Sequence, residues 1–137
     1  MRSIQRLAVL FLMSLLVSGL AAQVDLKQEA VVYFGSGANT SAPATIDEDR
    51  VRDATSEWQT IQSEGVRRGS ARYNLLVAEM EKRIRTAVRA AVSEKGNDLV
   101  VRSGDIQDAK GKTVADITND VIGKLNMTPL TLAKAAE

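Results

Sequence analysis

The sequence predicts an α+β fold in which a small β-sheet body carries a protruding antiparallel helical hairpin and a short C-terminal helix. An apolar, β-rich run at residues 29–34 comes before a long stretch of helical spacing at residues 46–95. A second apolar run at residues 99–101 follows that stretch, and helical spacing returns at residues 117–125. Two strands on either side of a long helical segment can share a sheet if the segment folds back on itself.

The first 22 residues have the order of a secretory signal peptide. Arg2 and Arg6 precede the apolar run LAVLFLMSLLV, and the small-residue stretch SGLAA follows it. The apolar run is shorter than the roughly 20 residues that a transmembrane helix needs. We therefore expect cleavage near Ala21 or Ala22, export of the mature chain and a single domain over residues 23–137. An uncleaved membrane anchor is the alternative.

Composition narrows the classes of function. The chain has 18 Lys and Arg residues against 17 Asp and Glu residues, and loss of Arg2 and Arg6 with the signal peptide leaves it near neutrality. A nucleic-acid-binding domain would be strongly basic, so we expect no nucleic-acid partner. The chain contains neither cysteine nor histidine. It therefore lacks disulfides, thiol nucleophiles, histidine bases and the usual zinc ligands. Its few aromatic residues favour assembly as a way to enlarge the core.

The body is predicted to comprise residues 23–45 and 96–126. Its first strand is EAVVYF at residues 29–34, which is rich in β-branched and aromatic residues and is followed by Gly35 and Gly37. Residues 35–45 then form a loop of small residues. The glycines of this loop lack the lysine and the spacing of a phosphate-binding loop, so we interpret it as an ordinary connection.

The arm is predicted to comprise residues 46–95, starting with a capping box formed by Thr45 and Glu48. Two apolar series follow a 3-then-4 spacing: Val51, Ala54, Trp58 and Ile61, and then Tyr73, Val77, Met80, Ile84, Ala87 and Ala91. The two series are out of phase, and the mismatch falls in SEGVRRGS, where two glycines disfavour a helix. We predict a turn there. The alternative, one continuous helix, would be about 75 Å long and would hold the flanking strands apart.

The second part of the body starts with the strand DLVV at residues 98–101. Ile106 is assigned to a further strand beyond a turn at Ser103 and Gly104. A loop around Gly111 leads to the final helix, with Asp116 as its N-cap. The apolar face of this helix is predicted to pack on the sheet and consists of Ile117, Val121, Ile122 and Leu125. Residues 127–137 are predicted to be a loose tail.

Two carboxylates of the segment DEDRVRD, those of Asp49 and Asp53, lie four residues apart, at helical spacing. Such a pair could hold a metal or act as an acid and a base. The intervening Arg50 and Arg52, and the position at a helix start where acids are favoured, instead indicate a solvated first turn. We therefore predict no catalytic, cofactor-binding or metal-binding residues, no cofactor and no enzymatic activity.

Two motifs near the end of the chain carry a family resemblance. The stretch RIRTAVRAAVSEKGNDLVV at residues 83–101, with VADITNDVIGKLN at residues 114–126, resembles the C-terminal half of the Skp (OmpH) family of periplasmic chaperones. In that family a basic helix enters a DLVV-type strand and, after a hairpin, the chain reaches a DIT-x-DV helix. The resemblance implies a homotrimer whose helical hairpins hold unfolded outer-membrane proteins. The helical segment at residues 46–95 is shorter than that of the family, so we expect a short-armed member.

The resemblance suggests two sets of candidate residues. The candidate client-binding residues are Trp58, Arg67, Arg68, Arg72 and Tyr73. The simpler interpretation of the two aromatic residues is that they pack between helices. The simpler interpretation of the arginines is that they lie in a solvated turn. In the functional interpretation the arginines attract acidic clients or an anionic membrane surface. The candidate trimer contacts are Val31, Val32, Leu99, Val100, Val101, Ile117 and Val121.

Two functions of different classes follow from these expectations. The first is an ATP-independent periplasmic holdase for unfolded outer-membrane proteins, which expose apolar faces and strand edges until they insert. The second is a non-enzymatic structural or adaptor module of the cell envelope that docks through its helical arms.

Overall fold

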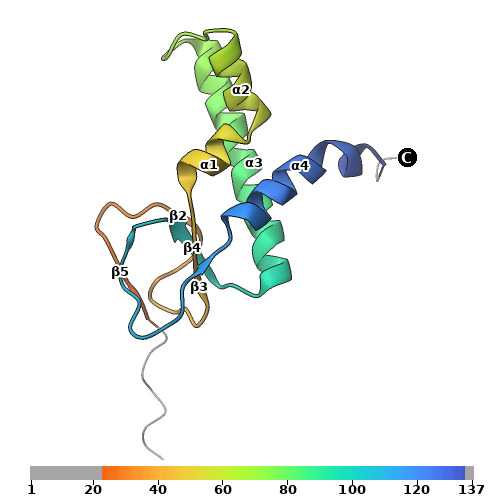
Figure 1. Cartoon of the computed structure of the whole chain (residues 1–137). Coiled ribbons are helices and arrows are strands. Elements are labelled where there is room, and N and C mark those ends of the chain that lie inside the picture. Colours follow the sequence, from red (N-terminus) through yellow and green to blue (C-terminus); the bar gives the residue numbers. More distant parts are fainter. Residues whose placement is uncertain (1–22, 135–137) are drawn as a thin grey trace, which may run out of the picture.

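A computed structural model describes residues 23–134, and within them the chain is an α+β fold with four helices and two small sheets (Figure 1). The predicted signal peptide and residues 135–137 of the predicted tail lie outside the described residues. The larger sheet is the middle layer. Helices pack on one of its faces, and a two-stranded sheet packs on the other.

The larger sheet has the strand order β2-β4-β3-β6. Its strands are β2 (Val32–Gly35), β4 (Leu99–Arg102), β3 (Pro43–Ile46) and β6 (Ala115–Asp116). Strand β2 runs antiparallel to β4, whereas β3 runs parallel to both β4 and β6. The predicted strands at residues 29–34 and 98–101 are confirmed as β2 and β4, with slightly shifted ends.

Strand β3 lies in the segment that the sequence assigned to a loop, and that assignment was wrong. The sequence PATI begins with a proline and has no alternation of large apolar residues, so it gave no local strand signal. It forms a strand because it lies between two others, and Ala44 and Ile46 are completely buried there. Thr45 therefore belongs to β3 and caps no helix. Asp47 caps the next helix instead, and its carboxylate accepts a hydrogen bond from the Arg50 amide.

The smaller sheet pairs β1 (Asp25–Leu26) with β5 (Ile106–Asp108) in antiparallel orientation. The predicted strand at Ile106 is thus confirmed, but its partner is β1 and not β4. This sheet covers the face of β4 that presents Leu99 and Val101, which form a small apolar cluster with Val24.

The helices are α1 (Glu48–Asp53), α2 (Ser56–Ser63), α3 (Ala71–Lys95) and α4 (Thr118–Lys134). Helix α3 ends where the sequence predicted, since Gly96 adopts a left-handed conformation and its amide donates to the Val92 carbonyl over 2.8 Å. Helix α4 packs mainly on α3 and less on the sheet, which differs from the expected packing. It also continues to Lys134, where the sequence predicted a loose tail from residue 127.

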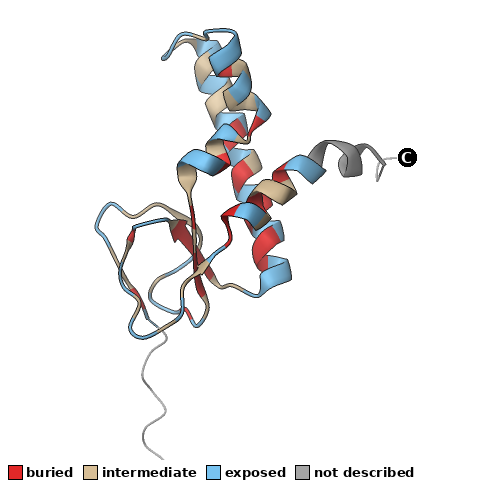
Figure 2. Cartoon of the chain, viewed as in Figure 1, coloured by how far each residue is buried: buried red, intermediate tan, exposed pale blue. Residues whose placement is uncertain are grey.

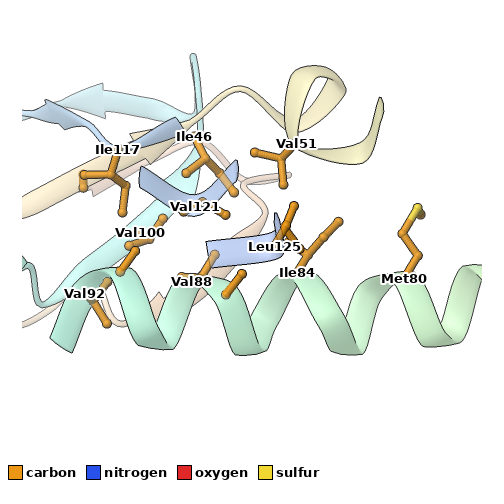
Figure 3. Packing of buried hydrophobic residues seen from close by; sticks show 13 residues of the cluster. Ile46, Val51, Met80, Ile84, Val88, Val92, Val100, Ile117, Val121 and Leu125 are labelled. Carbon is orange, nitrogen blue, oxygen red and sulfur yellow. The ribbon is translucent and has the colours of Figure 1, made fainter. Parts of the chain in front are cut away.

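The main core lies where α3, α4, α1 and the larger sheet meet (Figures 2 and 3). Side chains from β3, β4, α1 and α4 point toward α3 (Figure 3). The residues of this core include Ile46, Val51, Ile84, Val88, Val92, Val100, Ile117, Val121 and Leu125.

Five of the seven predicted trimer contacts are therefore used inside the single chain. Val100, Ile117 and Val121 belong to the main core, and Leu99 and Val101 to the smaller cluster. The sequence pattern identified these residues as apolar contacts, but it could not show that layers of the same chain cover both faces of β4. Of the remaining two, Val32 is half-buried and also packs against the smaller cluster, whereas Val31 is half-buried just before the edge strand β2.

The Asp98 carboxylate holds the start of β3 against the start of β4. It accepts hydrogen bonds from the Thr40 hydroxyl, from the Ser41 amide and hydroxyl over 2.7 and 2.9 Å, and from the Ala42 amide over 3.0 Å. Burial favours the neutral carboxyl, but these hydrogen bonds outweigh that effect and hold the pKa of Asp98 far below its usual range. The glycine-rich loop is thus fixed to the sheet by one ionised side chain.

Gly35 lets β2 approach this same point. Its φ is +77°, and a β-carbon at this position would lie 2.0 Å from the Asp98 carbonyl oxygen, so only glycine fits.

Replacing Asp98 by asparagine tests this anchor. Because the pKa of Asp98 is lowered on folding, its stabilisation is present above about pH 4 and is lost as the pH falls further. We expect Asp98→Asn to reduce the free energy of unfolding by about 2 kcal/mol at pH 7, since several hydrogen bonds to a charged acceptor are weakened. The difference from wild type should shrink between about pH 4 and pH 2 in urea unfolding measured by circular dichroism.

The exposed Asp108 supplies the control: its carboxylate accepts a backbone hydrogen bond from the Lys110 amide alone, so Asp108→Asn should destabilise the fold much less than Asp98→Asn. A pH-independent difference between wild type and Asp98→Asn would contradict the assignment.

Candidate functional site: the helical arm

The base of the arm is helix α1, which is fixed to the body. Val51 is completely buried in the main core. The Asp47 amide donates to the Thr118 hydroxyl over 2.9 Å, and the Arg50 guanidinium donates to the Asn119 side chain over 2.8 Å. Both partners lie at the start of α4. Helix α1 is therefore attached to the body through the start of α4.

The chain breaks its helical path between α1 and α2. Thr55 lies at this junction and is only 1% exposed. Its hydroxyl donates to the Arg52 carbonyl over 2.6 Å and accepts from the Trp58 amide at 3.3 Å, so it ends one helix and caps the next. This break was not predicted, because Ala54 fits the apolar series of an unbroken helix.

Helix α2 lies along the outer part of α3, and the chain reverses direction over residues 64–70 (Figure 1). Ile61 is 4% exposed in this contact. The Arg83 guanidinium binds the Glu57 carboxylate at 3.0 Å and also donates to the Ser56 hydroxyl. At the turn, Glu64 and Arg72 form a second ion pair. The phase break in the sequence thus coincides with a real turn between two packed helices.

Trp58 both packs and remains accessible. It is half-buried against the main core, and the Arg52 guanidinium lies 4.5 Å from its ring centroid. That guanidinium also binds the carboxylates of Asp49 at 2.8 Å and Asp53 at 3.0 Å. The two carboxylates that lie at helical spacing in the sequence are therefore both paired with one arginine. An open groove of about 680 Å³ runs beside Trp58.

The other predicted client-binding residues lie at the turn or just after it. Arg67 and Arg68 are exposed and form no salt bridge within residues 23–134. Arg72 is exposed but paired with Glu64. Tyr73 is half-buried in the first turn of α3, where its amide donates to the Ser70 hydroxyl over 3.1 Å. The structure therefore brings four of the five residues together at the far end of the arm and leaves Trp58 nearer the base.

Sequence reasoning missed Leu75, which is 59% exposed at this far end. Its neighbours Leu76 and Val77 are half-buried, and so is Val66 in the turn. The signal was present in the sequence, because the run LLV at residues 75–77 makes the helix apolar on more than one face. We use the name arm-end surface for the accessible apolar side chains near the turn, which lie on more than one face of α3: Val66, Tyr73, Leu75, Leu76 and Val77.

Neither a metal-binding cluster nor a membrane-spanning helix is found among the described residues. Across residues 23–134, no three or more His, Cys, Asp or Glu side chains are grouped so that they could hold a metal ion. None of the helices in that part of the chain combines the length and apolar character needed to cross a membrane.

No known family, curated protein or solved structure matches this chain in comparisons of its sequence and structure.

The junction at Thr55 can be tested with an isosteric substitution. Thr55→Val keeps the volume but removes both hydrogen bonds of the hydroxyl, so we expect it to lower the free energy of unfolding by about 1 kcal/mol. Thr60 is the matched control, since its hydroxyl only bonds the Ser56 carbonyl within α2, and Thr60→Val should be neutral within about 0.5 kcal/mol. Urea unfolding followed by the fluorescence of Trp58, the single tryptophan, measures both. Equal effects of the two substitutions would argue against a special role for the junction.

Proposed function

We propose that this protein is an ATP-independent holdase of the periplasm, which binds unfolded outer-membrane proteins with protruding helical arms and works as a homotrimer. The arm-end surface beside an unpaired basic turn is the observation that carries the proposal. Apolar side chains that the folded chain leaves accessible to water gain free energy when a bound client covers them. The resemblance of residues 83–101 and 114–126 to the Skp family supports the same function.

Capture and holding are assigned to different residues. Charges at Arg67 and Arg68 act over roughly 8 Å at physiological salt, so they increase the rate of encounter with acidic segments more than the lifetime of the complex. Burial of Leu75 and its neighbours against a client removes apolar surface from water and slows release. The same arginines would also attract an anionic membrane surface. Assays without lipid measure client capture alone and so separate the two effects.

The two open edges of the larger sheet support the proposed homotrimer. Within residues 23–134, β2 and β6 each have a strand on one side only. Sheets with open edges readily pair with another chain. The trimer joins through such an edge and the neighbouring surface of α4, because most of the other apolar strand residues are already used inside the single chain.

An aggregation assay tests the proposal. An outer-membrane barrel protein diluted from urea should stay soluble when wild-type protein is present at near-stoichiometric trimer, as followed by light scattering. Leu75→Ser should raise the rate of client release about fivefold, corresponding to about 1 kcal/mol of lost apolar contact. Asn74 is an exposed neighbour on the same helix, so Asn74→Ser should have no effect.

The arginines are tested in the same assay by changing Arg67, Arg68 and Arg72 to glutamine. We expect slower capture and a weaker dependence on salt, with thermal stability nearly unchanged. Aggregation that proceeds unchecked with wild-type protein, together with a stable partner recovered from the envelope, would favour the adaptor function instead. A folded monomer at micromolar concentration in sedimentation would overturn the trimer.

A further inference from the structure

A small pocket lies between strand β2 and helices α1 and α3. It has a volume of about 110 Å³ and is lined by Val31, Tyr33, Glu48, Arg52, Met80, Glu81, Ile84 and Arg85. The aliphatic residues supply an apolar interior, in which Met80 and Ile84 are 8% and 5% exposed. An apolar cavity of about 150 Å³ can hold benzene, so this pocket has room for one aliphatic side chain.

The pocket opens next to an unpaired strand edge. Strand β2 is the last strand of its sheet, and within residues 23–134 its outer side pairs with no other strand. The Arg85 guanidinium lies across this side. It donates to the Val32 carbonyl over a long 3.4 Å and lies 5.8 Å from the centroid of the Tyr33 ring. The edge is thus covered by one exposed, flexible side chain and not by a strand or a helix.

The charges around the pocket indicate what kind of partner fits. Two carboxylates, Glu48 and Glu81, and two guanidiniums, Arg52 and Arg85, surround it. These four charges cancel. Burial and the Glu48 carboxylate also raise the pKa of Tyr33 to about 12, so its phenol is neutral. A phosphate-rich lipid surface or nucleic acid would meet carboxylates here, whereas an uncharged peptide chain meets a balanced rim.

An extended peptide fits both the edge and the pocket. Its backbone can form the hydrogen bonds that an open strand edge lacks, and every second side chain points to the same face. One apolar side chain can then enter the pocket while its neighbours remain in water. Strands of outer-membrane barrels alternate apolar and polar residues in this way.

We propose that β2 binds an extended, alternately apolar segment of a non-native polypeptide as an added strand, with one aliphatic side chain in the pocket between Val31, Met80 and Ile84. Arg85 moves aside when the segment binds. The inference rests on the proposed holdase function and adds a second contact, on the body, to that of the arm-end surface. It leaves the β6 edge and α4 for the trimer contact.

Backbone methylation of a peptide tests the strand addition directly. The probe is a fluorescently labelled peptide that alternates leucine and threonine over about nine residues, enough to exceed the length of β2. Methyl groups on the amides that face β2 should weaken binding at least about tenfold, because they remove its hydrogen bonds, whereas methyl groups on the alternate amides should leave the affinity within about twofold. Fluorescence anisotropy measures both. Equal binding of the two methylated peptides would overturn the proposal.

Variants of the chain locate the pocket. Val31 is half-buried, so Val31→Phe should fill the pocket and weaken peptide binding about tenfold, while Arg85→Ala should strengthen it because the edge is uncovered. Arg89→Ala is the matched control, because Arg89 is exposed one turn further along α3 and does not line the pocket, and it should leave the affinity for the peptide unchanged. Unfolding curves establish that each variant is folded.

The aggregation assay separates failure of this inference from failure of the holdase function. If wild-type protein prevents aggregation but Val31→Phe and both methylations leave peptide binding unchanged, the strand addition is wrong and the holdase function stands. If wild-type protein does not prevent aggregation, the holdase function itself fails. Slow amide exchange of β2 in an oligomer without peptide would mean that a second copy occupies the edge, which also overturns the inference.

Discussion

The parallel pairing of β3 with β4 fixes both ends of the helical arm. Helix α1 leaves the end of β3, and α3 leads through Gly96 into the start of β4. Since the two strands are parallel, the arm leaves the sheet at the end of β3, and α3 must run back along the sheet to enter β4 at the opposite end. The Asp98 carboxylate holds the loop before β3 at the beginning of β4, and Gly35 allows β2 to approach the same point. The position of the arm therefore depends on a few backbone contacts in the sheet.

The arm itself depends on that support. An isolated helix as short as α2, with 8 residues, is not stable in water, so it must be held by the Thr55 cap, the packing of Ile61 and the contact between Glu57 and Arg83. Helix α3, with 25 residues, is buried against the body in its second half and is mostly exposed near the turn. Apolar side chains near the turn thus remain accessible while the base of the arm is packed. The proposed holdase function requires this combination, because a holdase must present apolar surface without losing its own fold.

Local signals predicted the elements that local interactions determine. The left-handed Gly96, the apolar strand β4, the seam of α3 and the turn between α2 and α3 could all be identified from short stretches of sequence. Strand β3 could not, since PATI becomes a strand only through pairing with residues far along the chain. Thr45 and Glu48 had the spacing of a capping box, but the hydrogen bonds of β3 continue through Thr45, and Asp47 takes the capping role.

The candidate site shows the same limit. The cluster of Arg67 and Arg68 at a glycine-flanked turn was visible in the sequence. The exposure of Leu75 was not predicted, because Leu75 lies outside the apolar series from which the packing of α3 was predicted. The pocket beside β2 was beyond prediction, since Val31, Glu48 and Ile84 come from three separate segments that only the folded chain brings together.

Native-state hydrogen exchange tests most directly whether the β3–β4 pair belongs to the part of the structure that opens only when the whole chain unfolds. Amides that open only on global unfolding exchange most slowly, whereas those in locally unstable segments exchange faster. The structure predicts the slowest exchange at residues 44–46, at residues 99–101 and in the buried second half of α3, with faster exchange in α2 and fastest exchange at residues 64–70. Exchange of residues 44–46 as fast as that of the turn would contradict the account, because it would mean that β3 opens without unfolding the body that positions the arm.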